Sequence, residues 1–182
     1  MKPIGPLMIE HRLIERMIRL IEMKEKKMEE HGKADFDFVD VAVDFVRVYA
    51  DRTHHGKEED ILFRDLAKKN MAEEDRRLMD ELVEEHRYGR RLVADLNEAK
   101  EGYIRGHKQS LEVVFKKLRA LVDFYPEHIR KEDKVFFPHA MGYLSQQEQE
   151  AMLQECWEFD RHMIHEQYGS IVETWEKREG QG

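Results

Sequence analysis

The amino-acid sequence predicts an all-α protein, an antiparallel up-down-up-down four-helix bundle with an additional C-terminal helix. Three observations support this fold class. Apolar residues recur three and four positions apart along most of the 182 residues, whereas the period-two alternation of strands is almost absent. The four prolines and ten glycines lie mostly near the ends of the periodic segments. Four long helices joined by short loops are typical of a bundle.

Proline, glycine and N-cap residues indicate where each helix begins and ends. We expect five helices, over residues 6–30, 36–68, 71–100, 110–137 and 145–177. Pro6 lies at the start of the first helix and Gly32 lies just after its end. Asp35 is a suitable N-cap for the second helix. Asn70 and Glu73 have the spacing of a capping box for the third.

The last two helices are bounded in the same way. The fourth helix is expected to stop before Pro138, and Pro126 inside it should produce a kink or a local irregularity. Ser145 and Glu148 form a second capping box, at the start of the fifth helix. The first four helices are long enough to form the bundle by themselves, so the fifth is expected to pack outside it.

Composition excludes several classes of function. Acidic residues outnumber basic residues by 39 to 31, which argues against a nucleic-acid or anionic-membrane partner. No apolar stretch approaches the roughly 20 residues that span a bilayer, and the N-terminus lacks the apolar run of a signal peptide. Cys156 is the single cysteine and has no partner for an internal disulfide. We expect a cytoplasmic protein with a bundle domain over residues 1–140 and a helical extension over residues 141–182.

Each of the first four helices carries a histidine within its apolar stripe, namely His11, His54, His86 and His128. Residues at one height of an antiparallel helical hairpin are equidistant from the connecting turn. Successive histidines have their midpoints at positions 32.5, 70 and 107, which coincide with the expected loops. The four histidines are therefore expected to lie in one layer of the core.

A metal site is the simplest explanation of such a layer. Glu58 and Glu132 each follow a histidine by one helical turn, and buried polar groups without partners would cost several kcal/mol. Imidazoles and carboxylates suit iron, manganese or zinc rather than calcium, and this set is large enough for two ions bridged by the glutamates. In the alternative register of the second helix, His55 and Glu59 would face the core; we favour His54 with Glu58, because the alternative also buries Arg52.

At these positions the sequence resembles the hemerythrin-like family, also called the HHE cation-binding family. The matching segments, over about residues 6–138, are IEHRLI around His11, HHGKEEDILF from His54 to Phe63, EEHRYG around His86 and HIRKEDKVFFP from His128 to Pro138. The resemblance implies a non-haem di-iron centre, with two Fe ions cycling between Fe2+ and Fe3+ and an oxo or hydroxo bridge. Mn or Zn fits the same residue types. The implied ligands are His11, His54, Glu58, His86, His128 and Glu132.

The sequence departs at two positions from the oxygen-carrying hemerythrins of marine invertebrates. Those proteins have a His-x-x-x-His pair on the third helix, whereas here Arg90 follows His86 by four residues. They also have an aspartate five residues after the histidine of the fourth helix, whereas here Glu132 follows at four. The set of four histidines and two glutamates is similar to that of microbial hemerythrin-like and iron-centre repair proteins. Fewer imidazoles would leave an additional coordination position open, which argues against simple reversible oxygen carriage.

The resemblance implies a protein that binds or senses O2, NO or a related small ligand. Alternatives are an enzyme that turns over peroxide or NO, supplied by an electron-donor protein, and a protein of iron homeostasis or iron-centre repair. From another class, a metal-free helical interaction module would use the polar layer to set its register. Candidate groups beside the ligands are Tyr125, Tyr88, His55 and Glu59. A second copy of the chain, packed against the final helix, is a candidate partner.

Overall fold

The computed structural model describes the backbone of residues 2–179 and the side chains of residues 2–163. Its described residues form helices and no strands, which confirms the predicted fold class. The helices are α1 (Ile4–His31), α2 (Phe36–Asp44), η1 (Phe45–His55), η2 (Glu58–Phe63), α3 (Arg64–Leu66), α4 (Glu73–Ile104), α5 (Ser110–Lys131), η3 (Glu132–Phe136), α6 (Phe137–Ala140), η4 (Met141–Tyr143) and α7 (Gln146–Glu179). None of the helices in the described part of the chain is long and apolar enough to cross a membrane.

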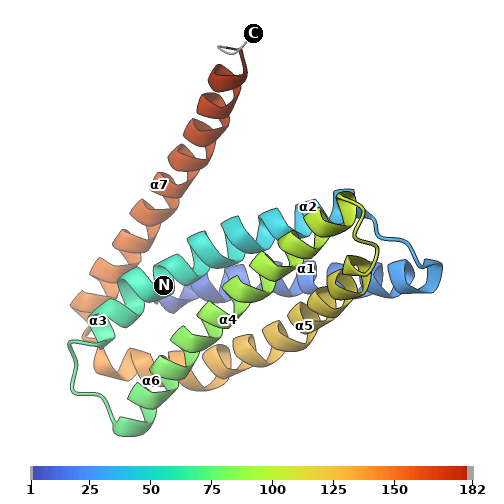
Figure 1. Ribbon diagram of the computed structural model, residues 1–182. Helices are drawn as coiled ribbons and strands as arrows, with labels where there is room; N and C mark the ends of the chain where they lie inside the picture. Colours follow the sequence, from blue (N-terminus) through green and yellow to red (C-terminus); the bar gives the residue numbers. More distant parts are fainter. Residues whose placement is uncertain (1, 180–182) are drawn as a thin grey trace.

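Four helical rods run antiparallel and form the bundle (Figure 1). They are α1, the continuous path from α2 to α3, α4, and the path from α5 to α6. Contacts join α4 to α5, α5 to α1, α1 to η1 and η1 to α4, so the four rods enclose one interior. Helix α7 starts beside α6, contacts η2 and η1, and then extends away from the bundle (Figure 1).

The helix ends agree with the predicted caps at α2 and α7, but two boundaries differ from the prediction. The fourth rod was expected to stop before Pro138, yet it continues through α6 to Ala140, because proline is tolerated in the first turn of a helical segment. The start of α4 differs as well. The Asp35 side chain accepts a hydrogen bond from the Phe38 backbone N–H at 3.2 Å, and Ser145 and Glu148 form the expected capping box. Asn70 was expected to cap α4, but the helix begins at Glu73, because Ala72 is extended (φ −56°, ψ 146°). Its first turn carries Glu73, Glu74 and Asp75, whose charges favour a helix N-terminus.

Three stretches are π-helical, with a wider turn than an α-helix: η1, η2 and η3. They lie on the second and fourth rods, and η1 carries His54 and His55 while η2 begins at Glu58 and η3 at Glu132. Helix α5 continues through Pro126 without ending, and the irregularity expected on this rod begins six residues later, at η3. π-helical turns are rare and concentrate at functional sites.

Two apolar clusters fill the bundle, and a polar layer separates them. The larger cluster includes Ile21, Val39, Leu96 and Leu118, and it lies on the side of the loops after α1 and α4. The smaller cluster includes Leu7, Leu66, Leu82 and Phe137, at the end where α7 begins. The layer between them holds the buried histidines and glutamates. Apolar packing on both sides thus keeps the layer away from water.

Replacing Leu118 by Ala should lower the free energy of unfolding of the metal-free protein by about 2–5 kcal/mol, because Leu118 is fully buried and its loss leaves a cavity. Chemical denaturation measures this change. The matched control is Val113→Ala on the same helix, where the side chain is 40% exposed and the expected loss is below about 1 kcal/mol. Equal losses in the two variants would contradict the assignment of Leu118 to the core.

Candidate metal centre

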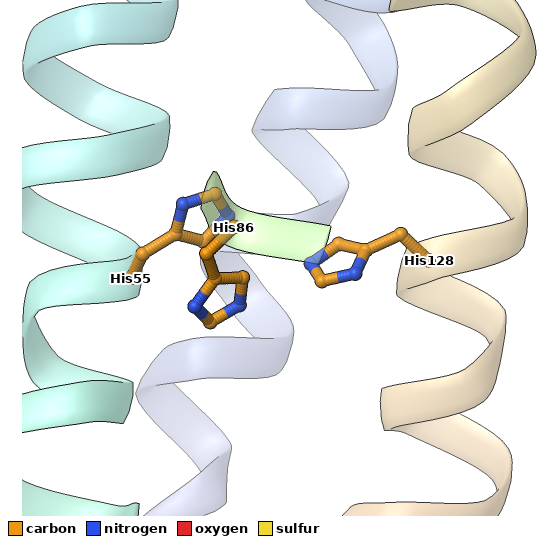
Figure 2. Close-up of side chains that lie close together, drawn as sticks. All are labelled: His55, His86 and His128. Atoms are coloured by element: carbon orange, nitrogen blue, oxygen red, sulfur yellow. The ribbon is translucent and has the colours of Figure 1, made fainter. Parts of the chain in front are cut away.

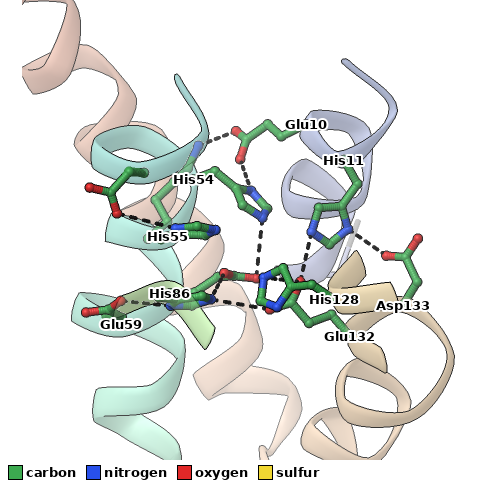
Figure 3. Close-up of polar contacts among 12 residues, drawn as sticks. Glu10, His11, His54, His55, Glu59, His86, His128, Glu132 and Asp133 are labelled. Carbon is green, nitrogen blue, oxygen red and sulfur yellow. Dashed lines mark hydrogen bonds and ion pairs between the residues drawn. The ribbon is translucent and has the colours of Figure 1, made fainter. Parts of the chain in front are cut away.

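The structure brings the six side chains expected as ligands into one buried layer. Figure 3 labels the four histidines and Glu132. The six side chains come from all four rods, and each is at most 2% exposed: His11, His54, Glu58, His86, His128 and Glu132. The four histidines therefore lie at one height of the bundle, as their equal distances from the connecting turns predict. The register that we favoured on the second rod is also found, because both His54 and Glu58 point into the layer.

The inner nitrogen atoms of the histidines surround the two carboxylates. Glu58 lies between two imidazoles, at 3.5 Å from His54 Nε2 and 3.3 Å from His86 Nε2. Glu132 lies among three, at 3.2 Å from His11 Nε2, 3.5 Å from His86 Nε2 and 3.4 Å from His128 Nε2. Each carboxylate therefore faces imidazoles from more than one rod, as a group that bridges two ions would.

His55 lies in the layer together with His54, an arrangement that the sequence did not predict. It was expected beside the ligands, but its side chain is 1% exposed and its ring stacks on His86, with centroids 3.9 Å apart and an interplanar angle of 10°. Figure 2 shows His55, His86 and His128 converging from three rods. The sequence argument chose one of two registers for the second helix, although side chains about 100° apart can share a broad inner face. The π-helical turn of η1 lets both imidazoles enter the layer.

The inner donor atoms of the layer form no hydrogen bond with the protein, and their contacts with one another are imidazole–carboxylate pairs at 3.2–3.5 Å. Among the described residues, the buried side-chain nitrogen and oxygen atoms without a hydrogen bond are the Nε2 atoms of the five histidines and the four carboxylate oxygens of Glu58 and Glu132. Nine such atoms in one place would be costly unless something binds them. They fall into two groups, and within each group the donor atoms lie within 4.8 Å of one another. The first group is His55, His86 and His128, and the second is His11, His54, Glu58 and Glu132. This donor set fits two metal ions.

Each histidine is held from behind by a carboxylate. The Nδ1 atoms lie 2.8–3.3 Å from carboxylate oxygens in the pairs His11–Asp133, His54–Glu10, His55–Asp51, His86–Glu59 and His128–Glu85. The imidazole donates from Nδ1, so Nε2 is directed into the layer and can bind an ion once any proton on it has been displaced. Such a carboxylate orients a ligand histidine and increases its basicity. Glu59, a candidate for a group beside the ligands, lies in this position.

Cations in turn neutralise these carboxylates. Arg12 pairs with Asp133, Lys57 with Glu10, Arg90 with Asp51 and Glu59, and Lys131 with Glu85. Arg90 occupies the position at which the third helix of marine hemerythrins has a second histidine, and its guanidinium donates to both carboxylates at 2.7 Å. The five imidazoles are therefore surrounded by a shell of paired charges.

The two tyrosines proposed beside the ligands differ in position. Tyr125 is buried, and its ring is perpendicular to that of His128, with centroids 6.4 Å apart. Burial raises the pKa of its hydroxyl, which therefore stays protonated. Tyr88 was wrongly expected at the site: it is 41% exposed and packs on Phe124, whose ring separates it from His128. Only two positions after His86 on α4, Tyr88 points about 200° away from it.

A cavity of about 430 Å³ leads to the layer between η1 and α4. Its lining includes Asp51, His55, Gly89, Arg90, Ala94 and Tyr125. A Cβ atom at Gly89 would lie 3.9 Å from the Tyr125 hydroxyl oxygen, so the glycine leaves space beside that hydroxyl. Sequence reasoning did not predict this cavity, because side-chain packing between two rods decides it.

Without a bound ion, the layer is held together by charge. Burial by itself would lower the pKa of His11, but the carboxylates of Asp133 and Glu132 outweigh it and raise the pKa to about 10. Burial likewise opposes a charge on His86, yet Glu132 and Glu58 raise its pKa well above the usual value. For His55, burial and the neighbouring imidazoles lower the pKa, so this ring stays neutral.

Comparison with known protein families finds a match to the hemerythrin HHE cation binding domain over residues 2–140. No curated protein and no solved structure matches the chain. The matched residues include the whole polar layer and end before α7.

Metal affinity is expected to rise with pH. Below about pH 10 His11 is protonated in the metal-free protein, and His86 is held protonated in the same way, so an ion must displace these protons. Affinity should increase by up to about tenfold per pH unit for each proton displaced. The stabilisation from protonated His11 is complete below pH 6.5, its ordinary pKa, and is lost as pH rises towards 10. Co2+ titrations between pH 6.5 and 8.5 measure this dependence, and a pH-independent affinity would contradict it.

Proposed function

Because the chain belongs to the family of hemerythrin HHE cation-binding domains, we propose that its polar layer holds two iron ions and binds or senses O2, NO or a related small ligand. The observation that carries this proposal is the set of nine buried donor atoms that form no hydrogen bond with the protein, divided into two groups. Bound iron would supply reversible ligand coordination and one-electron redox chemistry.

The two groups suggest how the protein would divide its ligands. His55, His86 and His128 would hold one ion, and His11 and His54 the other. Glu58 and Glu132 would bridge the ions, since each faces imidazoles of both groups. The hydrogen-bonded carboxylates behind the histidines would keep the five rings oriented whether or not an external ligand is present.

His55 changes one argument drawn from the sequence. Four imidazoles were expected to leave an additional coordination position and thereby to disfavour reversible oxygen binding. The structure supplies a fifth imidazole, from the second rod instead of the third, where Arg90 stands. With His55 as a fifth donor, the number of imidazoles no longer argues against simple reversible oxygen carriage.

The cavity supports access by a small molecule. It reaches His55 and Tyr125 from the surface between η1 and α4, and the apolar clusters enclose the layer on both sides. The cavity would give a small ligand a route from the surface to the edge of the layer at His55.

A second candidate, turnover of peroxide or NO, is favoured by Tyr125. Its hydroxyl forms no hydrogen bond with the described residues and borders the cavity, where it could donate a proton to a ligand. A metal-free interaction module is disfavoured, because it would leave nine buried inner atoms without a hydrogen bond.

Anaerobic loading with Fe(II), followed by metal analysis, tests the proposal directly. We expect about two iron ions per chain in the wild-type protein and about one in His55→Ala, because the variant removes a donor from the three-histidine group. The matched control is His139→Ala, which changes a 54% exposed histidine and should keep both ions. Absence of bound iron in the wild-type protein would refute the iron site, and full iron content in His55→Ala would remove His55 from the ligand set.

Replacing Ala94 by Trp at the exposed side of the cavity should slow the reaction of the Fe(II)-loaded protein with NO or O2 by about tenfold or more, without loss of iron, because the indole obstructs the route. Stopped-flow absorption measures the rate. Ala151→Trp, on an exposed position of α7, is the control and should react as the wild-type protein does. Unchanged rates in Ala94→Trp would show that ligands enter elsewhere. Continuous consumption of the added ligand, in place of a stable adduct, would favour the enzymatic alternative.

A further inference from the structure

Helix α7 lies outside the residues that match the family, yet it contacts the shell around the metal layer. We propose that Asp160 of α7 is a positioning residue for the metal centre, acting through Lys57 and Glu10 on the imidazole of His54. This inference rests on the proposed function, since it concerns the binding of an ion by that imidazole.

The contacts form an unbroken chain from α7 to the layer. The Asp160 carboxylate accepts a hydrogen bond from the Lys57 ammonium, which also donates to Glu10. The second oxygen of Glu10 lies 2.9 Å from His54 Nδ1. On the other side of the ring, His54 Nε2 faces the Glu58 carboxylate at 3.5 Å. Asp160 is therefore connected to a candidate ligand through three successive charged contacts.

Lys57 differs from the other cations of the shell. Its side chain is fully buried, whereas those of Arg12, Arg90 and Lys131 are 53%, 37% and 18% exposed. Water can solvate those three cations but not the Lys57 ammonium. A buried charge requires compensation by partners. Lys57 has two carboxylate partners, and Asp160 is the one that α7 supplies.

The contact of α7 with the second rod is close at this point. A Cβ atom on Gly56 would lie 2.8 Å from Cζ of Phe159, so the phenyl ring packs directly against the backbone between His55 and Lys57. Phe159 precedes Asp160, and Gly56 precedes Lys57. The glycine therefore permits the approach that brings the two charged groups into contact.

The charge of Asp160 determines how strongly Lys57 acts on Glu10. Without that charge, Glu10 would be the only carboxylate that compensates the Lys57 ammonium, and the ammonium would attract the negative charge of Glu10 more strongly. Glu10 would then be a weaker acceptor for the Nδ1–H of His54, and the imidazole would be a weaker ligand. Removal of Asp160 should thus affect the ion bound by His54 more than the ion bound by the three-histidine group.

The experiment compares Asp160→Asn with Glu155→Gln in the full chain, using Co2+ as the probe. Glu155 is the matched control: it is also on α7, has a similar exposure of 44%, and pairs with Arg64, which contacts no candidate ligand. Titration followed by visible absorption gives the two affinities. Proton NMR of the Co2+-loaded protein gives the shifted N–H signals of the bound imidazoles, one for each histidine.

We expect Asp160→Asn to weaken one of the two Co2+ affinities by about threefold to tenfold, somewhat less than the usual effect of a direct hydrogen-bond partner. The N–H signal of His54 is identified by its absence in His54→Ala. In Asp160→Asn this signal should shift or exchange faster with solvent. Asp160→Glu should restore the wild-type affinity and signal, and Glu155→Gln should change neither. A merely structural contact of α7 would not select one imidazole signal.

Equal affinities and unchanged signals in Asp160→Asn would overturn the inference while leaving the two-ion proposal intact. Failure of the wild-type protein to bind Co2+ would instead overturn the metal proposal, and this inference with it. Circular dichroism checks the fold of each variant. Asp160→Ser, which removes the charge with a smaller side chain, is the second variant if Asp160→Asn loses helix, and the same outcomes apply to it.

Discussion

The structure depends on one constraint, the burial of five imidazoles and two carboxylates whose inner atoms form no hydrogen bond with the protein. Polar groups can be kept in such a place if the surrounding protein positions them and opposite charges or bound ions compensate them. The two apolar clusters exclude water from either side of the layer, and the outer carboxylates hold the rings from behind. Without these supports the layer would hydrate or rearrange, so much of the molecule serves to maintain it.

The outer shell shows how an acidic protein can hold so many charges near its core. Every carboxylate that holds a histidine also contacts a cation, so the negative charges are compensated close to where they lie. Arg90 illustrates the arrangement, since one guanidinium serves two carboxylates and thereby supports two histidines. Where marine hemerythrins have a further imidazole on the third rod, this protein has Arg90, which helps to orient His55 and His86 through their carboxylate partners.

Much of the fold and of the layer was predictable, because hydrophobic periodicity and equal distances from the turns are properties of the sequence alone. His11, His54, His86 and His128 follow those rules, and Glu58 and Glu132 follow the spacing of one helical turn. His55 was given a place beside the ligands because the argument chose a single register for the second helix, and apolar spacing does not reveal a π-helical turn. The predictions for Asn70 and Tyr88 failed because they required the exact start and rotation of α4, which the sequence pattern does not give. The contact of Asp160 with Lys57 could not be predicted, because it depends on how α7 packs against the bundle.

The π-helical turn of η1 also bears on how a site of this kind could change over evolutionary time. A π-turn accommodates one more residue than an α-turn between the same two ends. An inserted residue is thereby absorbed locally, and the helix on either side keeps its orientation. Adding or deleting a single codon near His54 would then change the number of imidazoles without rebuilding the bundle. The donor count of the centre could vary among descendants of one ancestral gene, while the other three rods kept their histidines in place.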